Sequence, residues 1–208
     1  MKHINFNEYD GFIFDLDGTI ADTMPVHYHA WTSTLERKTG QPSRFTEALF
    51  YSKGGVPARE IVAWLNKEHG YNLPIEETTE EKENLFLTFL SEVQPIEPVI
   101  NVVKKLGKER KLAVASGGYT EIVRHTLEKL GLLEYFPVLV GADQVKQGKP
   151  SPEIYLRAAE LLGVNPKKCL AFEDGEPGII SARAAGMQVI DVKPYYCEGR
   201  SWYTIPAK

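Results

Sequence analysis

The stretch Phe12-Ile13-Phe14-Asp15-Leu16-Asp17-Gly18-Thr19 decides the fold class of this 208-residue chain. Three apolar residues in succession are typical of a short strand that is buried on both faces. Asp15 then lies at the carboxyl end of the strand, where open α/β sheets place their ligand sites. Because two carboxylates this close repel each other, Asp15 and Asp17 indicate Mg²⁺, phosphate chemistry or a shared proton. A polar turn at the exit of the strand is the simpler alternative.

Short apolar runs recur along the chain, and a helical pattern precedes each run after the first. The runs cover residues 11–16, 112–115, 137–140, 169–172 and 188–192. Strands that alternate with helices predict a parallel, doubly wound sheet of the Rossmann-like α/β class. Gly131 and Gly186 follow two of the helical segments and predict left-handed helix ends.

The region 22–93 interrupts this alternation. Helical patterns with no convincing buried strand between them cover residues 27–38, 57–68 and 78–93. We therefore predict a helical domain at 22–93, inserted after the first strand of a core that comprises residues 1–21 and 94–208.

Composition excludes several classes of function. A formal net charge of −4 offers no basic surface for nucleic acid. No apolar run approaches the roughly 20 residues that a membrane span requires, and the polar segment 1–10 is not expected to be a signal peptide. Two cysteines make no disulfide framework, so we expect a cytoplasmic protein with Cys169 as a core residue and no assigned role for Cys197. The composition is compatible with a monomer and leaves the oligomeric state open.

Ser116, Gly117 and Lys149 follow later apolar runs, close to predicted helix starts. Glycines let backbone N–H groups approach a phosphate, and the start of a helix adds partial positive charge. A lysine at a helix start is unfavourable unless its side chain faces an anion. These residues therefore favour a phosphate site, although a tight turn and a solvated lysine are alternatives.

Glu173 and Asp174 end the fourth apolar run, directly before Gly175. Acidic residues are favourable at a helix N-terminus, so a purely structural role is one interpretation. The other interpretation is that Asp174 completes a shell of oxygen ligands with Asp15. Mg²⁺ fits such a shell because it prefers few carboxylates and keeps positions for phosphate and water.

Polar residues thus follow successive strands in the order Asp15-x-Asp17, Ser116, Lys149 and Glu173-Asp174. This order resembles the four motifs of the haloacid dehalogenase superfamily, and the resemblance spans nearly the whole chain. It implies that Asp15 attacks phosphorus to form an aspartyl phosphate and that Asp17 is the general acid and base. It also implies that the helical insert corresponds to the cap of that superfamily's first cap class.

The resemblance implies one set of residues that binds Mg²⁺ and another that binds the phosphoryl oxygens. Mg²⁺ would be held by the Asp15 carboxylate, the Asp17 backbone carbonyl and Asp174, with Glu173 as a ligand directly or through water. The phosphoryl oxygens would be bound by Ser116, Gly117 and Lys149.

Two longer segments resemble beta-phosphoglucomutase and its sugar-phosphate phosphatase relatives. They are Asp22-Thr23-x-Pro25-x-His27-x-x-Ala30-Trp31 and the stretch 172–187. By this resemblance His27 lies near the general acid-base aspartate, and Gly54 and Arg59 approach the substrate from the cap. A polar position on an amphipathic helix is the alternative for His27, and a solvated helix residue is the alternative for Arg59.

The resemblance implies a Mg²⁺-dependent phosphatase that hydrolyses small phosphorylated metabolites such as fructose 1-phosphate. Gly175 stands where the mutases carry serine, which favours hydrolysis. The alternatives are a phosphosugar mutase, a pyrophosphatase or a non-catalytic domain that binds phosphosugars or metal.

Overall fold

The computed structural model describes residues 4–54, 56–107 and 109–195. Within these residues, five parallel strands form the central sheet in the spatial order β5-β4-β1-β6-β7. The strands are β1 (Gly11–Phe14), β4 (Lys111–Ala115), β5 (Val138–Val140), β6 (Cys169–Glu173) and β7 (Gln188–Asp191). The predicted doubly wound parallel sheet is therefore confirmed.

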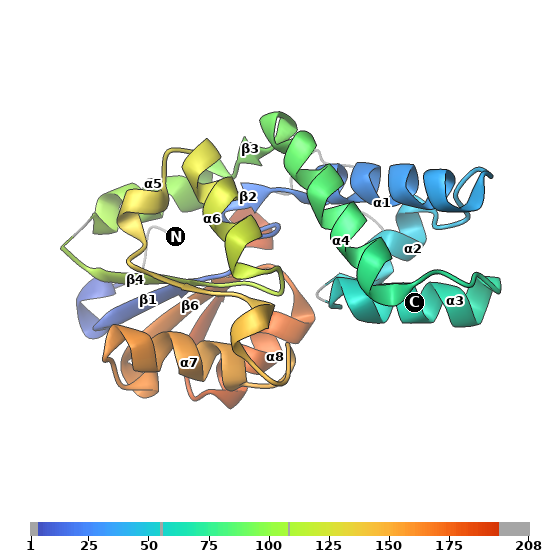
Figure 1. Ribbon diagram of the computed structural model, residues 1–208. Helices are drawn as coiled ribbons and strands as arrows, with labels where there is room; N and C mark the ends of the chain where they lie inside the picture. Colours follow the sequence, from blue (N-terminus) through green and yellow to red (C-terminus); the bar gives the residue numbers. More distant parts are fainter. Residues whose placement is uncertain (1–3, 55, 108, 196–208) are drawn as a thin grey trace.

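Helices cover both faces of this sheet (Figure 1). The helices of the core are α5 (Glu97–Leu106), α6 (Thr120–Lys129), α7 (Glu153–Leu162) and α8 (Glu176–Ala184). Side chains of a strand alternate between faces, so Phe12 and Phe14 pack with α5 and α6, whereas Ile13 packs with α7 and α8. The fully buried run in β1 is thus explained by a sheet that has a hydrophobic layer on each side.

Four further helices form a second group beside the sheet (Figure 1). They are α1 (Met24–Thr39), α2 (Glu47–Ser52), α3 (Ala58–His69) and α4 (Ile75–Thr88). They enclose a hydrophobic cluster of their own, which includes Trp31, Phe45, Val62 and Leu65. We call this group the cap.

A two-stranded antiparallel pairing joins the cap to the core. Its strands are β2 (Ala21–Asp22) and β3 (Gln94–Pro95), and Asp22 lies opposite Gln94. The predicted domain boundaries at residues 22 and 93 fall beside this pairing, and they stay a prediction.

Short 3₁₀ turns connect several of these elements. They are η1 (Phe6–Glu8), η2 (Leu90–Glu92), η3 (Leu133–Tyr135), η4 (Ala142–Gln144), η5 (Pro166–Lys168) and η6 (Lys193–Tyr195). Gly131 and Gly186 have φ angles of 66° and 83°, so both predicted left-handed helix ends are confirmed. Cys169 is a buried free thiol in β6, whereas Cys197 lies outside the described residues.

Two cap helices begin earlier than the sequence pattern predicts. The first starts at Met24 rather than at residue 27, with Pro25 in its first turn. Proline suits that position because it has no N–H to leave unpaired. The last starts at Ile75 rather than at residue 78, and Glu76 and Glu77 stabilise its first turn through the helix dipole. That helix ends at residue 88, so residues 89–93 are not part of it.

Across residues 4–54, 56–107 and 109–195, no helix has the length and apolar character needed to cross a bilayer.

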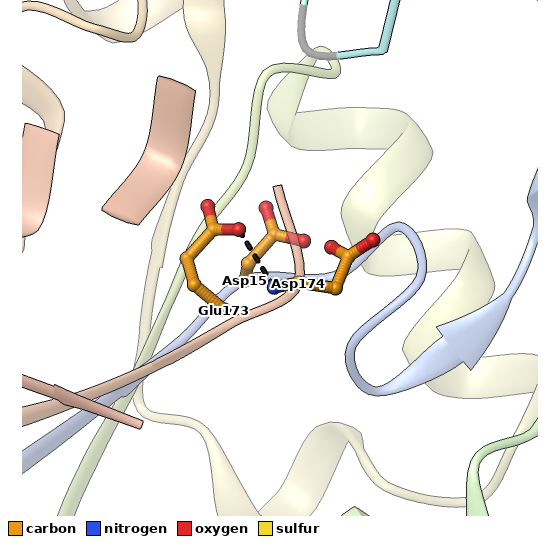
Figure 2. A group of neighbouring side chains, drawn as sticks. All are labelled: Asp15, Glu173 and Asp174. Carbon is orange, nitrogen blue, oxygen red and sulfur yellow. Dashed lines mark hydrogen bonds between the residues drawn. The ribbon is translucent and has the colours of Figure 1, made fainter. Parts of the chain in front are cut away.

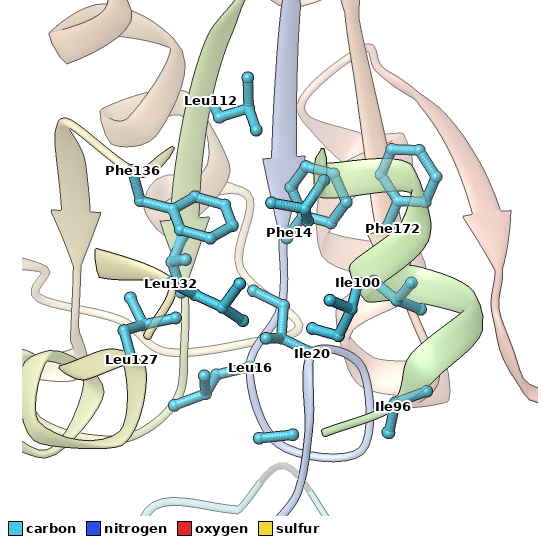
Figure 3. Close-up of a cluster of buried hydrophobic side chains, with 14 of the residues drawn as sticks. Phe14, Leu16, Ile20, Ile96, Ile100, Leu112, Leu127, Leu132, Phe136 and Phe172 are labelled. Carbon is cyan, nitrogen blue, oxygen red and sulfur yellow. The ribbon is translucent and has the colours of Figure 1, made fainter. Parts of the chain in front are cut away.

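Aromatic rings fill the hydrophobic layer beneath the carboxyl ends of the strands (Figure 3). Phe14 and Phe172 are neighbours in adjacent strands, and their rings stack with centroids 4.4 Å apart. Phe136 meets the Phe14 ring edge-on at 5.8 Å. This layer fixes the end of β1 and so the starting position of Asp15.

We expect Phe14→Ala to lower the free energy of unfolding by about 3–5 kcal/mol, because it removes a fully buried ring and leaves a cavity. Urea unfolding followed by circular dichroism gives the value. Ile180→Ala, at an exposed position of α8, is the control and should change that free energy by less than about 0.5 kcal/mol. Equal losses in both variants would contradict this assignment of the core.

Candidate active site

The candidate site lies at the carboxyl ends of β1, β4 and β6, which are adjacent in the sheet. Because these strands are parallel and in register, Asp15 after β1, Ser116 after β4 and Glu173 at the end of β6 reach the same edge. Lys149, from the loop before α7, contacts both Asp15 and Glu173. Residues separated by up to 158 positions in the sequence, from 15 to 173, thus meet in one site.

Three carboxylates converge here (Figure 2). One oxygen from each of Asp15, Glu173 and Asp174 lies within 4.8 Å of the others. Asp15 and Glu173 are buried, with 6% and 2% of their surface exposed. Burial raises the pKa of Asp15 well above its ordinary value, and the Glu173 charge raises it further. The same two causes raise the pKa of Asp174 to about 7.

Lys149 is the cation that faces this cluster. Its Nζ donates to Asp15 Oδ1 at 2.6 Å and to Glu173 Oε1 at 2.5 Å, and its side chain is only 4% exposed. Burial alone would lower the pKa of Lys149, but the Asp15 and Glu173 charges outweigh burial and raise it well above its ordinary value. The lysine is therefore charged and has a fixed position.

Two glycines allow the chain to approach these acids closely. Gly18 has a φ angle of 84°, and a Cβ there would lie 2.5 Å from Asp174 Oδ2. A Cβ on Gly178, at the start of α8, would lie 1.6 Å from Glu173 Oε1. No other residue type fits either position without moving an acid of the cluster.

The cluster fits a divalent cation. Three carboxylates outnumber the two lysines whose charges act on them, Lys149 and Lys193, in a buried site. Burial and the repulsion among the acids together raise the pKa values of Asp15 and Asp174. Carboxylate oxygens are the ligands that hard cations such as Mg²⁺ prefer. Asp15 and Asp174 are the residues best able to hold such an ion.

Asp17 lies beside the cluster and accepts hydrogen bonds on both carboxylate oxygens. The hydroxyl of Thr23 donates to Oδ1 at 2.7 Å, and that of Ser116 donates to Oδ2 at 3.2 Å. Burial alone would raise the pKa of Asp17, but hydrogen bonds from His27 and Thr23, together with the charge of Lys82, lower it below its ordinary value. Asp17 is therefore an ionised carboxylate in a fixed orientation.

His27 connects Asp17 to the cap. Its Nε2 lies 3.3 Å from Asp17 Oδ1, and its Nδ1 lies 2.8 Å from Nζ of Lys82. Because an ammonium group can only donate, Nδ1 accepts and Nε2–H donates to Asp17. Lys82 is 3% exposed and lies in α4, and the His27 ring stacks on Phe86 one turn further along that helix. The general acid-base candidate is thus linked to two cap helices.

Residues 12–192 match the family model described as haloacid dehalogenase-like hydrolase. The chain belongs to this family. It is 37% identical to the fructose-1-phosphate phosphatase YqaB of Escherichia coli over 188 residues, which cover 90% of this chain and 98% of that protein. It is 36% identical to the phosphorylated carbohydrates phosphatase of Thermotoga maritima, over 87% of this chain and 83% of that protein.

A solved structure supports the same family membership. The crystal structure of CbbY from Rhodobacter sphaeroides in complex with phosphate superimposes with a TM-score of 0.80 at 25% identity. The alignment covers 87% of this chain and 84% of that one. The predicted resemblance to the haloacid dehalogenase superfamily is therefore confirmed.

In this member of the hydrolase family, six of the predicted core residues come together, and Gly117 directly follows one of them, Ser116. Of the predicted cap residues, His27 contacts Asp17. Arg59, at the start of α3, pairs with Glu76 of α4 and is 57% exposed at its side chain. Burial raises the pKa of Tyr119 in the core, and the Arg59 charge opposes this. Gly54 lies in the turn after α2, where its N–H donates to the Tyr51 carbonyl.

Sequence reasoning missed several residues of the site. Lys82 occupies an inward position of α4, on the same face as Thr78 and Phe86, where an apolar residue would be usual. A lysine in the buried stripe of an amphipathic helix was the available signal. Thr19, whose hydroxyl lies 3.3 Å from Asp174 Oδ1, and Tyr155, which contacts Glu173, gave no comparable signal.

The raised pKa of Asp174 predicts a pH-dependent stability. Asp174 holds its proton more tightly in the folded protein than in the unfolded chain, so ionisation of Asp174 lowers the free energy of unfolding. This loss of stability is absent below about pH 4 and complete above about pH 7. In EDTA, the gain in unfolding free energy from Asp174→Asn should therefore grow by more than about 1 kcal/mol between about pH 4.5 and pH 8. Urea unfolding at both pH values measures it.

Asp10→Asn is the matched control, since Asp10 is exposed at the opposite end of β1. Its effect on stability should be nearly the same at both pH values. A gain for Asp174→Asn that is larger at the lower pH would contradict the assigned repulsion within the cluster.

Proposed function

We propose that this chain is a Mg²⁺-dependent phosphatase that hydrolyses small phosphorylated metabolites, sugar phosphates among them, through an aspartyl phosphate on Asp15. The observation that carries the proposal is the convergence of Asp15, Lys149 and Asp17 at one edge of the sheet. A nucleophile, a cation for the phosphoryl oxygens and a general acid-base group then meet in one buried site. The sugar-phosphate phosphatases among its relatives support the substrate class.

Asp15 is the proposed nucleophile because it lies at the end of β1, where the stacked rings below hold it in position. Its carboxylate attacks phosphorus in line with the leaving oxygen. Lys149 and Ser116, with the N–H of Gly117, bind the phosphoryl oxygens and stabilise the charge that develops on them. Asp15, Asp174 and the Asp17 backbone carbonyl would hold Mg²⁺, which would supply further positive charge to the phosphoryl group.

Asp17 is the proposed general acid and base. As an ionised carboxylate it is ready to take a proton from the water that cleaves the aspartyl phosphate. For the first step it must donate a proton to the leaving oxygen. A phosphate dianion bound next to it raises the pKa of its carboxyl, so that Asp17 can carry that proton.

The cap supplies the proposed substrate selection. A Cβ on Gly148 would lie 3.6 Å from Pro57, so the cap approaches the loop that carries Lys149. Arg59 and Gly54 are the candidate substrate contacts on this side, and His27 holds Asp17 from the same side. Closure of the cap would exclude bulk water until the phosphate has been transferred.

A phosphate-release screen tests this function. Sugar phosphates, polyol phosphates and pyrophosphate are each incubated with the protein and Mg²⁺, and parallel reactions contain excess EDTA. Release from sugar phosphates that EDTA abolishes supports the proposal. Conversion of glucose 1-phosphate to glucose 6-phosphate without release would instead establish a phosphosugar mutase, and release from pyrophosphate alone would establish a pyrophosphatase. The cytoplasmic location expected from the sequence remains a proposal, and the oligomeric state stays open.

Asp15→Asn should abolish turnover and leave the fold intact. An amide cannot replace the carboxylate as nucleophile, and loss of a nucleophile can cost on the order of 10⁶ in rate. Steady-state phosphate release with the best substrate of the screen gives the rate, and thermal unfolding confirms the fold. The control Asp10→Asn should retain full activity. Activity of Asp15→Asn within about tenfold of wild type would show that Asp15 is not the nucleophile.

Arg59→Ala should impair hydrolysis of a bulky sugar phosphate far more than that of a small ester such as p-nitrophenyl phosphate. Contacts remote from the reacting bond drive closure and orientation, so both kcat and KM should suffer for the sugar phosphate. Steady-state kinetics on both substrates measure the difference. Arg157→Ala is the matched control, because Arg157 is an exposed arginine on α7 that also pairs with a glutamate. Equal effects of Arg59→Ala on both substrates would remove Arg59 from the substrate contacts.

A further inference from the structure

The carboxylate of Glu173 is fully engaged within the protein. Its Oε2 accepts the backbone N–H groups of Asp174 and Gly175, both at 2.9 Å. Its Oε1 accepts Nζ of Lys149 at 2.5 Å and the hydroxyl of Tyr155 at 3.1 Å. Each carboxylate oxygen has two lone pairs, so these four donors occupy all the favourable acceptor positions of Glu173.

Tyr155 is buried on the face of the sheet that α7 covers. It lies in the first half of α7, its exposed fraction is 0%, and it packs in the cluster that contains Ile13 and Ala171. Its ring lies against the lysine as well, with Nζ of Lys149 5.2 Å from the ring centroid. One side chain thus contacts both partners of the Lys149–Glu173 pair, the acid through its hydroxyl and the ammonium through its ring.

We infer that Tyr155 is a positioning residue for Lys149 and that it acts through Glu173, which accepts from both. The Tyr155 hydroxyl holds Glu173 Oε1 at the position where Lys149 Nζ also reaches Asp15. This inference rests on the proposed phosphatase function for its catalytic consequence. The arrangement itself stands on the contacts among these four residues.

The physical need for such a support follows from the lysine itself. A lysine side chain is flexible and its ammonium is a point charge, so its direction depends on its acceptors. Glu173 cannot move further toward α8, because its Oε1 already occupies the space that a Cβ on Gly178 would take. Without the tyrosine hydroxyl, however, one acceptor position on Oε1 is open, and Glu173 can rotate toward other donors or a cation. The lysine would then lose its fixed direction toward the phosphoryl oxygens.

The test compares Tyr155→Phe with wild type in two binding measurements and one kinetic measurement. Isothermal titration calorimetry gives the affinity for Mg²⁺ alone and for orthophosphate in saturating Mg²⁺, and phosphate release gives kcat. We expect orthophosphate affinity and kcat each to fall by about 10-fold, since loss of an outer partner commonly costs 10–100-fold. Affinity for Mg²⁺ alone should stay within about twofold.

Tyr9→Phe is the matched control. The Tyr9 hydroxyl donates to Gln188 Oε1 at 2.5 Å, near the amino ends of the strands, so this variant also loses one partly buried hydrogen bond of a tyrosine hydroxyl. It should lose stability without any change in orthophosphate affinity or kcat. A Tyr9→Phe variant with the same losses as Tyr155→Phe would show that the losses are general effects of destabilisation, which would overturn the inference.

A double-mutant cycle with Lys149→Met shows whether Tyr155 acts through the lysine. If it does, Tyr155→Phe should have no further effect on orthophosphate affinity once Lys149 is replaced. A full additional loss in the double variant would overturn the inference. A roughly 10-fold loss of Mg²⁺ affinity in Tyr155→Phe alone would overturn it as well, because Glu173 would then act on the metal.

The outcomes separate this inference from the proposed function. A wild-type protein that binds orthophosphate without turning over any phosphate ester would contradict the proposed function, and the binding cycle would still decide the role of Tyr155. A wild-type protein that neither binds orthophosphate nor releases it would overturn both.

Discussion

The mutual repulsion of buried carboxylates at the end of β1 is the constraint around which the site is arranged. Asp15, Glu173 and Asp174 lie close together in a buried site, and burial, with the Glu173 charge, raises the pKa values of Asp15 and Asp174. Lys149 offsets part of this charge. Everything nearby serves to hold the acids in place, from the rings beneath Asp15 to the glycines that leave room for Asp174 and Glu173. Such a cluster does not stabilise the fold, so its presence indicates a functional site.

The sequence predicted the core of the site well because the site follows from topology. Parallel strands in register bring their carboxyl ends to one edge, so polar residues placed directly after each strand must meet there. Asp15, Ser116 and Asp174 could therefore be placed without coordinates. Asp17 was placed by the same rule, being two residues beyond Asp15.

Side-chain contacts across the molecule could not be predicted in this way. Lys82 reaches His27 from another helix, and Tyr155 reaches Glu173 from α7. Both contacts depend on how helices pack, and periodicity shows only which face of a helix is buried. The starts of α1 and α4 were misplaced by three residues because the helical pattern in apolar residues begins later than the backbone helix. Pro25 favours the earlier start of α1, whereas Glu76 and Glu77 favour that of α4 through the helix dipole.

The cap has a hydrophobic cluster that shares no buried member with the two clusters of the core. Trp31, Phe45 and Val62 hold the cap helices to one another, while the rings around Phe14 hold the sheet. Val26 and Phe86 of the cap pack into the cluster around Phe14, and His27 contacts Asp17, so these positions are tied to the catalytic residues. Substitutions elsewhere in the cap can accumulate without loosening the catalytic residues. A lineage of such enzymes could change the molecules it acts on by small steps in one module, while the phosphoryl-transfer machinery stays constant in the other.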